Sequence, residues 1–379
     1  MRWSGREARG VTGNVAIRRM VVCGLAMSLG ALVGVRAAAA ASPTRWTLRV
    51  TLGSRTVEGM PLEWSEAEVN LLARDGRLWS FTPAEATDFK KVSDSFRAWS
   101  QSDIRDQLRR ELGRGFEVNG TAHYVVAHPV GQRDLWNERF EELYRSFTHY
   151  FAVRGLRLRE PEFPLVAIVF ATQAEFLRYA RGEGLAIGGN VLGYYSPRSN
   201  RISLFDIGAG QSTADQWQAN ADTIIHEAAH QTAYNTGVHR RFAATPRWVV
   251  EGLGTMFEAP GVWDSRAHTR LEDRINRGRL ADFKAMAGNL PDGVMAAMVS
   301  SDRLFEVAPA EAYAEAWALS FFLVEKHHEK YCRYLELTAA RPAFSQYGQA
   351  ERLADFTKVF GSDLRLLEAH FTRFISELK

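Results

Sequence analysis

The chain has 379 residues, and 46% of them are hydrophobic. This length is somewhat more than a single hydrophobic core usually organises, so we expect two domains. The formal net charge of the whole chain is +3. Residues 1–41 hold six Arg and one Glu, so the net charge of residues 42–379 is −2. These residues therefore have no excess of positive charge that would favour binding to nucleic acid or to an anionic membrane. With only Cys23 and Cys332, and Cys23 in that first segment, a disulfide-stapled scaffold is excluded.

Residues 1–41 are expected to be a signal peptide. Five arginines precede an apolar run of 16 residues, Met20–Val35, and a stretch of alanines follows it. The run is short for a membrane span, so a cleavable signal is favoured over an uncleaved anchor. Arg18 and Arg19 fit a twin-arginine signal or the basic start of an ordinary one. We therefore expect an exported protein, periplasmic or secreted, without stable membrane insertion after cleavage.

Residues 43–118 are expected to form a small β-rich domain. Short strands are predicted at Trp46–Leu52, Val69–Leu72 and Arg77–Phe81. The last two flank the turn residues Asp75 and Gly76, and a short charged helix over Asp103–Leu112 follows. The domain is either a structural cap or a module that recruits substrate, and its sequence does not decide between them.

Residues 119–379 have a different pattern, in which a sheet comes first and helices follow. Strands are predicted at Thr121–Val126, Leu165–Phe170, Val191–Tyr195 and Arg201–Phe205, and helices at Leu135–Phe151 and Gln173–Tyr179. The turn residues Ser196–Asn200 imply that the last two strands form a hairpin. From Asp215 onward nearly everything is predicted to be helical. This order predicts an α+β domain, with its chemistry where the two halves meet.

The segment His226-Glu-Ala-Ala-His230 is the central functional signal. Residues four apart on a helix lie on one face, so two imidazoles can bind one metal ion, and Glu227 beside them can take a proton from a metal-activated water. Good helical composition over Asp222–Tyr234 places the motif on a helix. Its apolar neighbours indicate a buried helix, where unpaired His and Glu would be costly. We therefore predict zinc ligands at His226 and His230.

A catalytic zinc needs a third protein ligand, and the segment Thr245–Gly254 is its expected source. Thr245 can cap a helix that carries Glu251 one turn further in. Glycines at 252 and 254 are poor helix formers, and close approach to the metal-bearing helix would explain them. We predict Glu251 as the ligand. His239 is the alternative, but its position after a glycine-containing turn favours an exposed loop.

The pattern His226-Glu-Ala-Ala-His230 followed by Trp248-Val-Val-Glu251-Gly resembles the gluzincins, thermolysin-like zinc metallopeptidases. More closely, it resembles the peptidase-MA-like putative metallopeptidases found as exported bacterial proteins. The resemblance is specific at the metal site and loose elsewhere. It implies zinc ligands at His226, His230 and Glu251, with Glu227 as catalytic base. It also implies a zincin-like domain over residues 119–379, with a mixed sheet, an active-site helix and a helical C-terminal half.

Further site residues are expected from the same resemblance. A strand edge beside the metal helix would pair with an extended peptide or protein substrate, and the predicted hairpin is the natural candidate. Tyr194 and Tyr195 would then line the cleft, or be ordinary strand aromatics. Tyr313 is the expected donor to the developing oxyanion, or else a core tyrosine. Asp222 and Glu258 are placed to accept the second N–H of a metal-bound imidazole, or to be surface charges.

Zinc-dependent hydrolysis of peptide bonds is therefore the expected function. One alternative is a scaffold or binding protein that has a zincin fold but is catalytically silent, that is, without activity. The presence of Glu227 argues against this alternative, because loss of that carboxylate is the simplest route to an inactive relative. Another is a zinc amidase that acts on a non-peptide substrate, for instance in the cell wall, because the metal chemistry is shared. The sequence leaves open the substrate and the oligomeric state.

Overall fold

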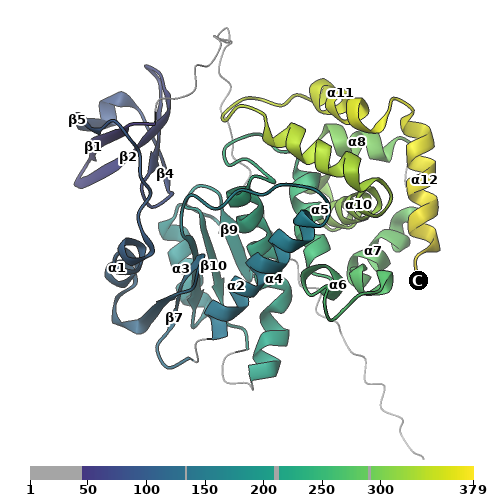
Figure 1. Ribbon diagram of the computed structural model, residues 1–379, viewed down its shortest axis with the longest axis horizontal. Helices are drawn as coiled ribbons and strands as arrows, with labels where there is room; N and C mark the ends of the chain where they lie inside the picture. Colours follow the sequence, from purple (N-terminus) through teal and green to yellow (C-terminus); the bar gives the residue numbers. More distant parts are fainter. Residues whose placement is uncertain (1–44, 133–134, 209–212, 289–291) are drawn as a thin grey trace, which may run out of the picture.

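The computed structural model describes residues 45–132, 135–208, 213–288 and 292–379. The predicted signal peptide, residues 1–41, lies outside them. The described chain holds two five-stranded sheets, and a β-rich part precedes a largely helical half, as the α+β prediction expects (Figure 1). Among the described residues, no helix has both the length and the apolar character that a membrane span requires.

The first sheet is antiparallel and has the strand order β4-β3-β2-β1-β5. Its strands are β1 (Thr47–Leu52), β2 (Arg55–Trp64), β3 (Val69–Ala73), β4 (Leu78–Phe81) and β5 (Ala86–Ser93). The three strands predicted from the sequence correspond to β1, β3 and β4. Gly76 turns the chain between β3 and β4 with a φ of 86°, a conformation that glycine adopts without a steric penalty.

The second sheet is mixed and has the strand order β6-β7-β8-β10-β9. It comprises β6 (Phe116–Gly120), β7 (Tyr124–Pro129), β8 (Leu165–Phe170), β9 (Gly193–Ser196) and β10 (Arg201–Phe205). Strands β7, β8 and β10 are parallel, and β9 forms an antiparallel hairpin with β10, as predicted. The predicted domain division after residue 118 falls inside β6, which pairs with β7 and so belongs to the second sheet.

Helices cover both faces of this second sheet. Strand residues alternate between faces, so Val125 and Val166 pack with α1 (Gln101–Leu112) and α3 (Gln173–Gly182). Tyr124 and Leu165 point to the opposite face and pack with α2 (Leu135–Ala152) and α4 (Thr213–Thr236). The result is three layers, with the motif helix α4 against the sheet (Figure 1).

The C-terminal half is built around one long helix, α10 (Pro309–Ala339). Its neighbours are α5 (Arg247–Phe257), α6 (Pro260–Trp263), α7 (Arg277–Ala287), α8 (Val294–Ser300), α9 (Leu304–Val307), α11 (Gln349–Phe360) and α12 (Leu364–Glu377). Every residue of α10 from Ala312 to Val324 is buried. His327 has non-helical backbone angles, and the helix resumes after this kink.

The first sheet contacts the turn of the β9–β10 hairpin. The Leu78 amide donates to the Arg198 carbonyl at 2.7 Å. Arg241 donates to the carbonyls of Gly76 and Pro197, both at 2.6 Å, and so joins the two sheets. A small apolar cluster that includes Phe163 fills the space between them. The N-terminal sheet thereby supports the hairpin next to the motif helix.

One carboxylate in the helical half is buried without compensation. Glu315, on α10, is 1% exposed, and neither of its oxygens has a hydrogen-bond partner among the described residues. Burial, with a smaller contribution from the charge of Glu368, raises the pKa of Glu315 from 4.5 to about 8. A neutral acid is therefore the stable form at pH 7, because desolvation penalises the charged form.

This raised pKa predicts how Glu315 affects stability. Between pH values of about 4.5 and 8 the unfolded chain releases this proton and the folded chain keeps it, so the free energy of unfolding falls by about 1.4 kcal/mol per pH unit. Wild-type stability should therefore fall relative to that of Glu315→Gln by roughly 3–4 kcal/mol between pH 5 and pH 9. Urea unfolding at the two pH values measures this difference. Parallel pH dependence in the two proteins would contradict it.

Candidate metal centre

Helix α4 brings both histidines of the motif to one place. His226 and His230 lie one turn apart and are buried, at 0% and 1% exposure. Their Nε2 atoms are 2.9 Å apart, and the rings stand nearly perpendicular, with an 88° angle between their planes. Two buried ring nitrogens at this distance would repel each other through their lone pairs, so they must share a proton or a bound cation. The sequence prediction that both project from one helical face is confirmed.

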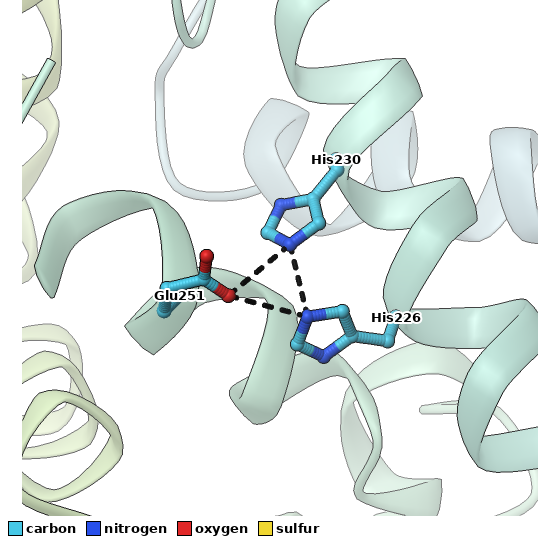
Figure 2. Close-up of side chains that lie close together, drawn as sticks. All are labelled: His226, His230 and Glu251. Atoms are coloured by element: carbon cyan, nitrogen blue, oxygen red, sulfur yellow. Dashed lines mark hydrogen bonds and ion pairs between the residues drawn. The ribbon is translucent and has the colours of Figure 1, made fainter. Parts of the chain in front are cut away.

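Helix α5 supplies the third side chain. The Oε2 atom of Glu251 lies 3.4 Å from His226 Nε2 and 3.5 Å from His230 Nε2. Figure 2 shows the three groups converging from two helices. The predicted capping differs in detail, because Pro246 takes the N-cap position of α5, and Asp302 accepts a hydrogen bond from the Arg247 amide at 3.0 Å.

Glycine at position 254 allows the two helices to approach this closely. A Cβ atom there would lie 2.8 Å from His226 Cε1 and 2.9 Å from His230 Cε1, well inside van der Waals contact. The explanation predicted for the glycines is thus confirmed at Gly254. Gly252 serves a different contact, since its Cβ would strike Ser320 and the Ala316 carbonyl on α10. One helix therefore uses two glycines to pack against two partners.

The donor set suits a divalent metal ion. His226, His230 and Glu251 each offer one ligand atom, and these atoms lie within 4.8 Å of one another. In a tetrahedral site with zinc–ligand distances of about 2.0–2.1 Å, neighbouring ligand atoms are about 3.3–3.4 Å apart. Two of the three observed separations, 3.4 and 3.5 Å, match this value, and the separation of 2.9 Å is shorter. The arrangement can hold a metal ion.

Electrostatics also favour a cation here. Although burial disfavours its charged form, contacts with Glu251 and Glu258 raise the pKa of His226 to about 10. Burial alone would raise the pKa of Glu251, but contacts with His226 and His230 hold it at about 2. Positive charge between the carboxylates is therefore stabilised, and a bound dication would take the place of the protons.

Glu258 orients the first histidine. Its Oε1 atom lies 2.8 Å from His226 Nδ1, and its Oε2 accepts a hydrogen bond from the Asn276 side chain at 2.7 Å. Carboxylates in this position fix the ring orientation and raise the basicity of metal-binding histidines. The sequence offered Asp222 and Glu258 for this role. Glu258 makes the contact, whereas the side chain of Asp222 is exposed on α4.

If the three side chains bind a metal ion, Glu258→Gln is expected to weaken the binding of added zinc by about 10-fold to 100-fold. The substitution removes the negative charge behind His226, and the single amide oxygen can accept from either His226 or Asn276, so the amide NH2 faces the other donor. Competition with a chromogenic chelator measures the affinity. Glu325→Gln is the control, because it removes a similarly part-buried carboxylate that contacts Arg274. Equal zinc affinity in wild type and Glu258→Gln would contradict the assigned role.

Glu227 is buried on the side of α4 that faces the hairpin. Its Oε2 atom accepts a hydrogen bond from the Tyr195 amide at 2.6 Å, and its Oε1 atom has no partner among the described residues. Burial raises the pKa of Glu227, although the neighbouring histidines oppose the shift. The carboxylate is thus held at one oxygen and available at the other.

His239 is not in an exposed loop, contrary to the sequence prediction. Gly237 adopts a φ of 94° at the end of α4, so the chain turns back and the His239 amide bonds to the Ala233 carbonyl. The side chain is 1% exposed, packs against Tyr234, and has no hydrogen-bond partner for either ring nitrogen among the described residues. Burial lowers its pKa to about 3, so the ring is neutral. The three-residue group that can hold a metal does not include it.

The three tyrosines considered from the sequence are all buried. Tyr195 donates its hydroxyl to Asn200 at 2.8 Å, and Tyr194 packs against Phe176 on the other face of the sheet. Both side chains therefore behave as strand aromatics. Tyr313 lies on α10, where the Phe305 ring meets its edge and the Arg279 guanidinium lies 5.3 Å from its centre. Its role in catalysis stays a prediction.

Comparison with known proteins connects the site to one family. Residues 220–345 match a family described as "Protein of unknown function (DUF1570)". The match covers one third of the chain and includes all of α5 and the part of α4 that bears the motif. No curated protein matches the chain.

Proposed function

We propose that the chain is an exported zinc metallopeptidase of the gluzincin type, with a zincin-like domain, periplasmic or secreted, that hydrolyses peptide bonds. One observation carries this proposal: His226, His230 and Glu251 converge on one point, and Glu227, on the same helix as the two histidines, keeps one carboxylate oxygen that has no partner among the described residues. This is the arrangement of ligands and base that metal-assisted hydrolysis needs.

Each residue then has a distinct task. His226, His230 and Glu251 would hold a zinc ion, which would supply a Lewis acid and lower the pKa of a water molecule towards 7. Glu227 would act as the base that accepts a proton from the attacking water and delivers it to the leaving amine. A raised pKa suits both steps, because the carboxyl must be a base first and an acid afterwards. Glu258 keeps the His226 ring in position throughout.

The substrate is proposed to be a peptide or protein that binds in extended form along β9. This strand lies at the end of the second sheet, and its Tyr195 amide is directed to Glu227 and not to β10. The catalytic carboxylate therefore lies at a strand edge. An extended peptide can add to such an edge through backbone hydrogen bonds.

Tyr313 is proposed to donate a hydrogen bond to the substrate oxygen that gains negative charge. Tyr313→Phe should then lower kcat by about 10²-fold to 10³-fold and leave KM nearly unchanged, because the contact forms only in the transition state. Phenylalanine preserves the ring packing against Phe305. Steady-state kinetics on one peptide measure the effect, with His239→Gln as the comparison. A large loss in His239→Gln and none in Tyr313→Phe would assign the donor to His239.

The proposed function is tested by loading the purified chain with zinc and following cleavage of unfolded casein, a peptide library and cell-wall fragments. Cleavage of casein or peptides that is lost when the metal is removed supports the peptidase. Cleavage of only a non-peptide amide in the cell-wall fragments favours the amidase alternative. Bound zinc with no cleavage of any substrate favours the silent scaffold.

A further inference from the structure

A cavity of about 780 Å³ lies in the helical half, among residues of α7, α8, α9 and α10. Helices α7, α8 and α9 each contact α10. Apolar side chains make up much of the wall, among them Met286, Val294, Met298, Leu304 and Val307. The volume is in the range of small-molecule sites. None of the metal-binding residues lines this cavity.

Glu315 also lines the cavity, and it is the buried carboxylate whose two oxygens have no partner among the described residues. It lies four residues after Glu311, so both side chains project from the same side of α10. Ala316 and Ser320 contact α5 from a neighbouring side of the same helix. The cavity and helix α5, which carries Glu251, thus lie on different sides of α10.

The charges around the cavity are mainly negative. Asp292 and Glu311 are exposed lining residues, and Arg303, the basic residue of the lining, is exposed as well. Glu315 is the charge-bearing group that is fully buried. A buried carboxylate next to apolar walls lacks the solvation and the hydrogen bonds that it would have in water, and a cationic donor restores both.

We propose that this cavity binds an amphipathic primary amine, with the ammonium group on Glu315 and an apolar chain along the methionine and aliphatic wall. An ammonium group offers three donors and a positive charge, which matches two carboxylate oxygens that no described residue contacts by a hydrogen bond. An apolar alcohol would fill the same wall without the charge, and an apolar acid would face the carboxylate with like charge.

The test is isothermal titration of the purified chain with n-alkylamines of four to ten carbons, and with octanol and octanoate. At about pH 8.5, Glu315 can ionise and the amines remain protonated. The amine that binds best should bind at least tenfold more tightly than octanol, and octanoate should not bind. Glu315→Gln should weaken amine binding at least tenfold, and the matched variant Glu311→Gln should change it less than threefold.

The proposal would be overturned if no amine bound to the wild type, or if octylamine and octanol bound with equal affinity. It would also be overturned if Glu315→Gln and Glu311→Gln weakened amine binding by the same factor. Thermal melting of each variant shows that it is folded, and removing an uncompensated buried acid should not lower the melting temperature. The metal centre does not enter the test, so the outcome is independent of the proposed peptidase activity.

Discussion

Exchanging Glu227 for glutamine is expected to lower kcat/KM for peptide hydrolysis by about 10²-fold to 10⁴-fold, the usual contribution of a general base. The glutamine amide oxygen can still accept the hydrogen bond from Tyr195, so the packing between α4 and β9 should survive. The zinc ligands are unchanged, so one zinc ion should remain bound per chain. The measurement is the initial rate on one cleavable peptide.

Asp222→Asn is the matched control for this prediction. It neutralises an exposed carboxylate on the same helix, one turn before the motif, and should leave the rate within about twofold. A rate in Glu227→Gln equal to that of the wild type would show that Glu227 is not the base. Loss of zinc together with activity would mean that Glu227 helps to build the site.

Gly254→Ala is expected to have the largest effect on metal binding among substitutions that keep all three ligands. The added methyl would lie 2.8–3.0 Å from atoms of both histidine rings, so the rings or the helices must move. Metal sites tolerate ligand displacements of only about 0.2 Å, so we expect zinc affinity to fall at least 100-fold. Chelator competition measures the affinity.

Two other glycine variants separate this effect from general destabilisation. Gly288→Ala adds a methyl with no atom within 4 Å and should bind zinc like the wild type. Gly252→Ala meets Ser320 and Ala316, so it should lower the melting temperature through the contact between α5 and α10. If Gly254→Ala kept wild-type affinity, the proposed reason for glycine at this position would be wrong.

The sequence predicts that His226, His230 and Glu251 lie together, because each element carries local signals. The spacing of His226 and His230 on a helix is a geometric constraint, and glycines at 252 and 254 indicate a close approach between helices. Strand β8 is predicted with the bounds that the structure has, because it is a continuous apolar run buried on both faces. These signals depend on neighbouring residues only.

Features that depend on distant contacts are not predicted. Strand β5 is mostly exposed and lacks an apolar alternation, and β2 contains Pro61 next to an irregularity in its pairing with β3. The burial of His239 follows from the turn at Gly237. The sequence suggests a turn there, but it does not show that the chain after the turn folds back against α4. The burial of Glu315 depends on several helices of the C-terminal half that pack around it.

Elemental analysis of the purified chain tests most directly whether His226, His230 and Glu251 bind zinc. We expect one zinc ion per chain in the wild type and in Asp222→Asn, and less than a tenth of that amount in His230→Ala and Glu251→Ala. Absence of zinc from the wild type after incubation with the ion, or full zinc content in His230→Ala and Glu251→Ala, would contradict the assignment of these three residues as zinc ligands.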